Sequence, residues 1–165
     1  MLHKNILSFT IILLTALCFA GCAPSLPKGM PPIYPCTITL TQEGVPLKGA
    51  SVALIPEDTT LNFTFAGTTT SSGNIEMYSH GKYRGIPAGK YKLVVTKKAN
   101  EIQNEKIWTV SLVDVKYTNP DTSPLQVDIA KKKNEFTFEL GQSVKIQISP
   151  AQTLKQYYGT PDEDK

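Results

Sequence analysis

Apolar and polar residues alternate at nearly every second position over most of the chain after residue 35. This alternation is typical of β-strands that turn one face to a hydrophobic core and the other to solvent. We therefore expect a series of short strands along this part of the chain. The alternating segments are 36–40, 52–55, 63–65, 75–77, 91–95, 108–112, 125–129, 136–140 and 144–148.

Turn-forming residues separate these segments, and only Ala99–Lys106 has a pattern compatible with a helical turn or two. Many short strands with frequent turns predict an all-β fold, an antiparallel β-sandwich of about seven to nine strands over residues 36–149. Within it, Cys36 has the phase of Ile38 and Leu40 and is expected to point inward. The turn signals are Glu43-Gly44, Lys48-Gly49, Ser72-Gly73, Pro87-Ala88-Gly89, Asn119-Pro120 and Lys133-Asn134.

The first 35 residues depart from the alternating pattern. A short positive start is followed by an almost wholly apolar stretch, residues 6–20, which ends in small residues. This stretch is shorter than the roughly 20 residues of a membrane-spanning helix, and the arrangement is typical of an export signal. Prolines then recur up to Pro35. We predict a signal peptide at 1–21 and a Pro-rich, semi-rigid tether at 22–35.

The end of the apolar stretch, Phe19-Ala20-Gly21-Cys22, resembles a bacterial lipobox. The resemblance implies that Cys22 becomes diacylated and anchors the mature chain to a membrane. The alternative is an ordinary cleavable signal that leaves Cys22 as an incidental thiol. Ala23 follows the cysteine, and by resemblance to sorting in bacteria with two membranes this favours the outer membrane. We expect an extracytoplasmic, membrane-anchored lipoprotein, in the outer membrane if the source has two.

The net charge and the cysteine content bear on two further features, a nucleic-acid partner and an internal disulfide. The formal net charge is only +3 and the basic residues are scattered, which argues against a nucleic-acid partner. Lipidation of Cys22 would leave Cys36 as the one free cysteine of the mature chain, so no internal disulfide is expected. The last residues, 150–165, form a polar segment predicted to be flexible; Tyr157 and Tyr158 within it could serve as a docking peptide.

Four short motifs within the strands resemble transthyretin-like, carboxypeptidase-regulatory-type β-sandwich modules. Small bacterial lipoproteins often carry such a module, and the likeness extends from about Pro35 to Leu140. It implies an extracytoplasmic accessory or adhesion-like domain without catalysis. The motifs are Gly44-x-Pro46-x-x-Gly49-Ala50-x-Val52-x-Leu54, Thr69-Thr70-Ser71-Ser72-Gly73-Asn74-Ile75, Ile86-Pro87-Ala88-Gly89-Lys90-Tyr91-x-Leu93, and Lys116-Tyr117 to Val127, with Asn134 to Leu140 as the closing strand.

One enzymatic relative of transthyretin hydrolyses 5-hydroxyisourate, so the basic residues of this module are candidates for the same chemistry. The resemblance would require catalytic histidines, an arginine and a C-terminal Tyr-Arg-Gly-Ser tail. Here His80 and Arg84 lie together in the 79–86 loop, Tyr83-Arg84-Gly85 is in mid-chain, and the chain ends differently. A solvated hairpin tip is the preferred interpretation of this loop, and the hydrolase is the less favoured alternative.

Few other residues of the chain could support catalysis or bind a metal ion. Asp114, Asp121 and Asp128 recur every seven residues but lack the dense oxygen ligands of a calcium loop, and we interpret them as strand-end and turn carboxylates. A zinc site needs three or four converging ligands, which one mature histidine and one cysteine do not supply. Cys36 has no neighbouring base in its motif, so we expect a small buried hydrophobe, with an intermolecular disulfide as the alternative. We predict no catalytic residues, metal or cofactor.

Binding to an envelope protein or a glycan therefore remains the expected activity. Aromatic side chains on a β-sandwich can stack on sugars, and Tyr78, Tyr83, Tyr117 and Trp108 are the candidates. Trp108 has the phase of Val110 and Leu112, which favours burial in the core instead. The Lys131–Lys133 run predicts a solvated hairpin tip that could also contact anionic lipid or polysaccharide. We predict a non-catalytic, lipid-anchored cell-envelope module, with a glycan-binding surface lipoprotein as the alternative.

Overall fold

The computed structural model describes residues 26–58, 64–104, 106–148 and 152–153 of the chain. The chain divides into two compact units, Met1–Met30 and Pro31–Lys165, and the folded domain belongs to the second. The predicted signal peptide, Cys22 and the tail beyond residue 153 lie outside the described residues. Within the described ranges, no helix has the length and apolar character needed to cross a membrane.

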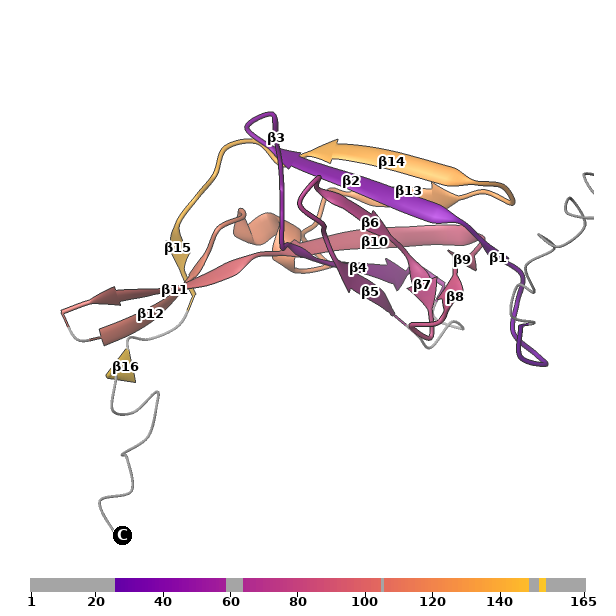
Figure 1. Cartoon of the computed structure of the whole chain (residues 1–165), viewed down its shortest axis with the longest axis horizontal. Coiled ribbons are helices and arrows are strands. Elements are labelled where there is room, and N and C mark those ends of the chain that lie inside the picture. Colours follow the sequence, from indigo (N-terminus) through magenta and orange to yellow (C-terminus); the bar gives the residue numbers. More distant parts are fainter. Residues whose placement is uncertain (1–25, 59–63, 105, 149–151, 154–165) are drawn as a thin grey trace, which may run out of the picture. The chain divides into compact units, whose positions relative to one another are not determined.

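The domain is all-β, and two four-stranded sheets enclose its core as the predicted sandwich (Figure 1). All neighbours in the first sheet are antiparallel, and β10 is its longest strand. The order of the first sheet is β13 (Gln126–Ile129), β10 (Gly89–Thr96), β4 (Ser51–Pro56) and β5 (Phe65–Thr68).

The second sheet contains a parallel pair that the expected antiparallel pattern did not include. β14 (Asn134–Glu139) runs parallel to β2 (Cys36–Gln42) on one edge. Two short antiparallel strands, β3 (Val45–Pro46) and β6 (Asn74–Glu76), share the other edge of β2. The parallel pair arises because the short connection from β13 to β14 crosses from the first sheet to the second instead of closing a hairpin within one sheet.

One hydrophobic core lies between the sheets, and most of its residues are those predicted from the alternation. Ile38 and Leu93, from opposite sheets, have no exposed surface. Tyr91 is equally buried; its ring meets Phe65 edge-on at 5.8 Å, and its hydroxyl donates to Pro87 O at 2.9 Å. Each such side chain contributes about 1.5–3 kcal/mol when removed from water, so burial of the alternating apolar positions is sufficient to explain the pairing of the sheets.

A third, smaller sheet, here called the arm sheet, continues the chain beyond β10. It consists of β11 (Lys98–Gln103), β12 (Lys106–Ser111), β15 (Ile146–Gln147) and β16 (Gln152–Thr153). Only Lys97 separates β11 from β10, and Figure 1 shows β11 and β12 running on past the end of β10. The possibility of a helical turn over Ala99–Lys106 was wrong: Asn104, with φ +51°, starts a hairpin turn and β11 pairs with β12 throughout.

The arm sheet also corrects the predicted orientation of Trp108. Its neighbour Ile107 is buried, whereas Trp108 and Leu112 are partly exposed, so Trp108 is not a core residue. Val110 is buried as expected, but it is not part of the main core cluster. β12 lies outside the sandwich. Packing in the sandwich interior therefore does not determine which face of β12 is buried.

Two short strand pairs complete the domain at the end where β2 begins. β1 (Ile33–Tyr34) pairs with β9 (Ile86–Pro87), so residues 33–34 of the predicted tether belong to the folded unit. β7 (Tyr78–Ser79) and β8 (Tyr83–Arg84) form a small hairpin that follows β6. We call this end of the sandwich the tether end.

At the opposite end, a carboxylate ties the two edges of the second sheet together. Glu139 Oε1 accepts hydrogen bonds from the backbone N–H groups of Glu43 and Gly141, both at 2.9 Å, and Oε2 accepts one from Gly44 at 3.2 Å. A hydrogen bond from the Thr41 side chain and these backbone donors favour the ionised form and lower the pKa of Glu139 below its ordinary value of 4.5. The charge therefore helps to hold the β2–β3 turn against the end of β14.

This arrangement makes stability depend on acidity. A group whose folded pKa is depressed stabilises the fold above its unfolded pKa, and that contribution is lost as the pH falls through the folded pKa. We expect Glu139→Gln to lower the urea midpoint at pH 7, and its difference from the wild-type chain to disappear as the pH falls through the lowered pKa of Glu139. Glu135→Gln, which removes only an exposed pair with Lys133, is the control and should change little at either pH. An effect of Glu139→Gln that does not depend on pH would contradict this role.

Candidate functional site

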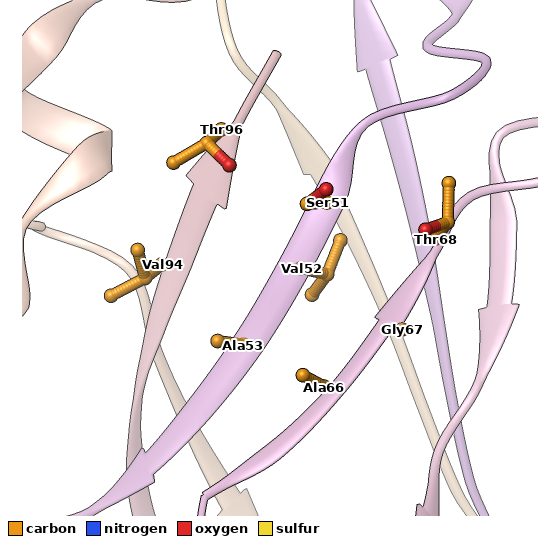
Figure 2. A pocket seen from close by; sticks show the side chains of 8 residues that line it. All are labelled: Ser51, Val52, Ala53, Ala66, Gly67, Thr68, Val94 and Thr96. Carbon is orange, nitrogen blue, oxygen red and sulfur yellow. The ribbon is translucent and has the colours of Figure 1, made fainter. Parts of the chain in front are cut away.

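A shallow hollow of about 400 Å³ lies over strands β4, β5 and the end of β10 in the first sheet (Figure 2). It exists because small side chains face each other across neighbouring strands: Ala53 lies opposite Ala66, and Ser51 opposite Thr68. Val94 and Thr96 of β10 border it on the other side of β4. The lining residues are Ser51, Val52, Ala53, Ala66, Gly67, Thr68, Val94 and Thr96.

The hollow offers shape and hydroxyl groups, but it has no charged side chain among its lining residues. Ser51, Thr68 and Thr96 supply the polar groups, and nothing that lines the hollow could act as a general base toward them. A serine or threonine hydroxyl is a weak nucleophile without such a base. The hollow therefore has the chemistry of a contact surface, not of an active site.

The chain's one arginine is held in a hydrogen-bonded group on the outer face of the β7–β8 hairpin. Arg84 lies directly opposite Tyr78 in the hairpin register, and Glu76 precedes them on β6. The Arg84 guanidinium pairs with Glu76 Oε1 at 2.5 Å, and the Tyr78 hydroxyl donates to Oε2 at 3.1 Å. All three side chains are exposed, so the pair contributes little to stability and both carboxylate oxygens are already occupied.

The structure places His80 and Arg84 on a hairpin, as the preferred interpretation of the 79–86 loop expected. His80 lies at the turn with φ +51° and is exposed. The guanidinium of Arg84 is engaged by Glu76 at the surface, away from the hollow described above. His80 and Arg84 are therefore not among the residues that line the hollow.

The three aspartates have local structural positions. Asp114 caps the 3₁₀ helix η2 (Val115–Thr118): its carboxylate accepts a hydrogen bond from the backbone N–H of Lys116 at 3.0 Å. Asp121 and Asp128 are exposed. Among the residues that the structure describes, no group of three His, Cys, Asp or Glu side chains is placed to hold a metal ion.

The four aromatic candidates for sugar stacking do not form one surface. Tyr117 is 7% exposed and packs into the core, so it was wrong as an exposed platform. Tyr78 is exposed, but Tyr83 alternates with it and points to the other face of the β7–β8 hairpin. Trp108 is on the arm sheet. Sequence spacing could not separate these cases because burial of Tyr117 depends on how η2 packs beside β10.

Cys36 points inward, as its phase predicted. The side chain is 2% exposed at the start of β2, and burial raises the pKa of its thiol from 9.0 to about 12. Because the thiolate is the reactive form, the thiol is inert at neutral pH. A buried and protonated Cys36 leaves no role for it as a nucleophile, and an intermolecular disulfide would require the strand to open.

This burial predicts the reactivity of the thiol. In a mature chain carrying Cys22→Ser, we expect Cys36 to react with a disulfide reagent roughly a thousandfold more slowly than an exposed thiol, since its thiolate is scarcer by that factor. An exposed cysteine introduced by Ser72→Cys provides the matched control, and both should react equally in urea. Rapid native-state reaction of Cys36 would show that β2 opens readily at this end.

Comparison with known proteins assigns no family. No family model matches the chain, and no curated protein matches it. Among solved structures, the major pilin subunit of Bacillus cereus has a TM-score of 0.39 and 19% identity, covering 67% of this chain and 30% of its own. An adhesin candidate from Bacteroides ovatus ATCC 8483 has a TM-score of 0.38 and 16% identity, covering 73% and 50%.

A third solved structure, a 9R-lipoxygenase from Cyanothece PCC8801, has a TM-score of 0.34 and 11% identity, covering 79% of this chain and 20% of its own. The chain thus spans half or less of the length of each of these three proteins. With TM-scores below 0.5, these likenesses give the chain neither a family nor a function.

Proposed function

We propose that this chain is a non-catalytic module of the cell envelope that is anchored to a membrane by lipid on Cys22. The observation that carries the proposal is the order of features at the start of the sequence: positive residues, a short apolar stretch, then small residues directly before Cys22. Such a segment directs export, and two acyl chains give firm attachment where one would be marginal. Ala23 after the cysteine favours the outer membrane if the source has two.

The chemistry of the folded domain supports a non-catalytic role. The groups with catalytic potential are occupied or inert: Cys36 is buried and protonated, and Arg84 is bound to Glu76. The hollow on the first sheet is lined by methyl and hydroxyl groups. These features suit a domain that presents surfaces to an envelope partner and does not transform a substrate.

A transthyretin-like type is the finer part of this proposal. The motifs that carry the resemblance place a glycine at each turn, and in the structure these glycines adopt positive φ values, which glycine tolerates best. They lie at the β2–β3 turn, before β4, before β6 and at the start of β10. The residues are Gly44 (φ 74°), Gly49 (φ 71°), Gly73 (φ 75°) and Gly89 (φ 150°).

Radiolabelled palmitate and membrane fractionation test the anchor in a bacterial host. We expect the full chain to be labelled and to be recovered in the membrane pellet. The Cys22→Ala variant should be unlabelled, and it should be recovered as the uncut precursor, because lipidation and leader removal depend on this cysteine. Cys18→Ala and Cys36→Ala are matched controls that should label normally. Labelling that persists after Cys22→Ala, or a soluble mature chain cut elsewhere, would contradict the proposal.

A further inference from the structure

Two turns flank the beginning of β2, one on each side: the connection between β13 and β14, and the turn of the β7–β8 hairpin. On one edge, the parallel register sets Asn134 beside Cys36, and the Asn134 N–H donates to Pro35 O at 2.8 Å. On the other edge, the Met77 N–H donates to Cys36 O at 2.9 Å. The chain arriving at β2 therefore passes between the β13–β14 connection and the β7–β8 hairpin, and Figure 1 shows both at the end where β1 lies.

Both turns carry exposed lysines. Lys131 and Lys132 form the turn between β13 and β14, and Lys82 lies in the turn between β7 and β8 with its ammonium 5.5 Å from the Tyr83 ring centre. All three lysines are exposed. In the described part of the chain none of the three has a carboxylate within ion-pairing distance.

Five carboxylates lie at this end: Glu57 and Asp58, which are exposed directly after β4, and three that lie next to cations. Glu135 pairs with Lys133, and Glu76 is taken by Arg84. Asp128 lies directly opposite Lys90 in the register of β13 and β10. Within the part of the domain that the structure describes, Lys82, Lys131 and Lys132 are thus exposed cations without an ion-pair partner on two turns of the tether end, where they are accessible to an approaching surface.

The short segment between Cys22 and β1 indicates that this approaching surface is the membrane. Eleven residues lead from Cys22 to Ile33, the first residue of β1, and they can span at most about 36 Å. If Cys22 carries the lipid, the chain enters the sandwich at the tether end, which is therefore the end nearest to the anchor along the chain. Each lysine close to an anionic membrane surface strengthens binding by about fivefold, within a screening distance of about 10 Å.

We propose that Lys82, Lys131 and Lys132 contact anionic lipid headgroups of the membrane in which Cys22 is anchored, and so hold the tether end against the bilayer. This inference rests on the proposed lipid anchor. The contact leaves the opposite end of the sandwich and the arm sheet facing away from the membrane, because β10 alone separates the two ends by about 25 Å. The hollow between β4, β5 and the end of β10 then lies on the side available to a partner.

Lysine acetylation read by mass spectrometry tests the contact on the lipidated chain. The chain is reconstituted in vesicles of phosphatidylcholine alone or with one-third phosphatidylglycerol, at low salt. We expect Lys82, Lys131 and Lys132 to react several-fold more slowly in the anionic vesicles, and 0.5 M NaCl to abolish the difference. Lys98 and Lys106, exposed on the arm sheet, are internal controls that should react equally in both.

A pair of charge-removal variants sharpens the test. Lys131→Ser with Lys132→Ser should reduce the protection of Lys82, because the remaining hairpin is then held less firmly at the surface. Lys98→Ser with Lys106→Ser removes the same charge from the arm sheet and should leave that protection unchanged.

The outcomes separate the anchor from the contact. A chain that fails to float with either kind of vesicle contradicts the lipid anchor and overturns the contact with it. A chain that floats but shows equal labelling in both vesicles overturns the contact alone. Stronger protection of the three lysines by a soluble anionic polysaccharide than by vesicles would assign the two turns to a glycan and would also overturn the membrane contact.

Discussion

Gly73→Ala is expected to lower the free energy of unfolding by about 3 kcal/mol, although it adds a single methyl group. Gly73 has φ +75°, a conformation that costs an alanine about 1–2 kcal/mol. A β-carbon there would also collide with Leu40 O and come within 3.2 Å of Leu47 N. Gly73 cannot move away easily, because its carbonyl accepts the Leu40 N–H at 2.9 Å. The backbone strain and the steric collision therefore both lower the free energy of unfolding, and their effects add.

Gly44→Ala is the matched control for this prediction. Gly44 has nearly the same φ, +74°, but a β-carbon there meets nothing within 4 Å. Strain alone predicts a loss of about 1–2 kcal/mol. Urea unfolding of the mature chain, followed by circular dichroism, measures both variants. Equal losses at the two positions would show that the close approach of β2 to the turn before β6 does not matter for stability.

The second large effect is expected from Asn134→Ala, at about 2–3 kcal/mol of unfolding free energy. The Asn134 side chain is 6% exposed and closes the β13–β14 turn. Its Oδ1 accepts the Ala130 N–H at 2.9 Å, while Nδ2 donates to Ala130 O at 3.1 Å and to Lys132 O at 2.6 Å. A fourth hydrogen bond, also from Nδ2, reaches Pro35 O at 3.4 Å. Alanine removes all of these hydrogen bonds at once, and only Ala130 O and Pro35 O keep a backbone donor.

Urea unfolding and amide hydrogen exchange measure this effect. The Asn134→Ala chain should also lose exchange protection at the Ala130 N–H, because its acceptor is gone. Asn74→Ala, at an exposed position on β6, serves as the control and should cost less than about 0.5 kcal/mol. Unchanged protection at Ala130 would mean that the turn is held by its backbone bonds alone.

Asn134 also affects the proposed membrane contact. Asn134 fixes the β13–β14 turn beside Pro35, which brings Lys131 and Lys132 to the tether end. An Asn134→Ala chain that still folds should therefore show weaker protection of these lysines on anionic vesicles. The position of the basic turns depends on a single buried amide, whose role is visible only once the strands are paired.

The glycine-containing turns and the inward faces of the strands were predictable from the sequence. Ile38 and Leu40, like Leu93 and Val95, occupy alternate positions of their strands and are fully buried. The period of two suffices because successive side chains of a strand point to opposite faces. The leader and Cys22 also remain sequence-level predictions, since they concern processing and lie outside the described residues.

Tertiary structure alone decided which strands became neighbours and which candidate residues were exposed. Alternation shows that a strand has a buried face but not which strand covers it, so the parallel pairing of β14 with β2 could not be inferred. It also could not show that β12 leaves the sandwich, which partly exposes Trp108, or that η2 buries Tyr117 beside β10. The placement of Lys82, Lys131 and Lys132 at the tether end has the same cause: residues about 50 positions apart reach one end of the domain only because β2 receives a strand on each edge.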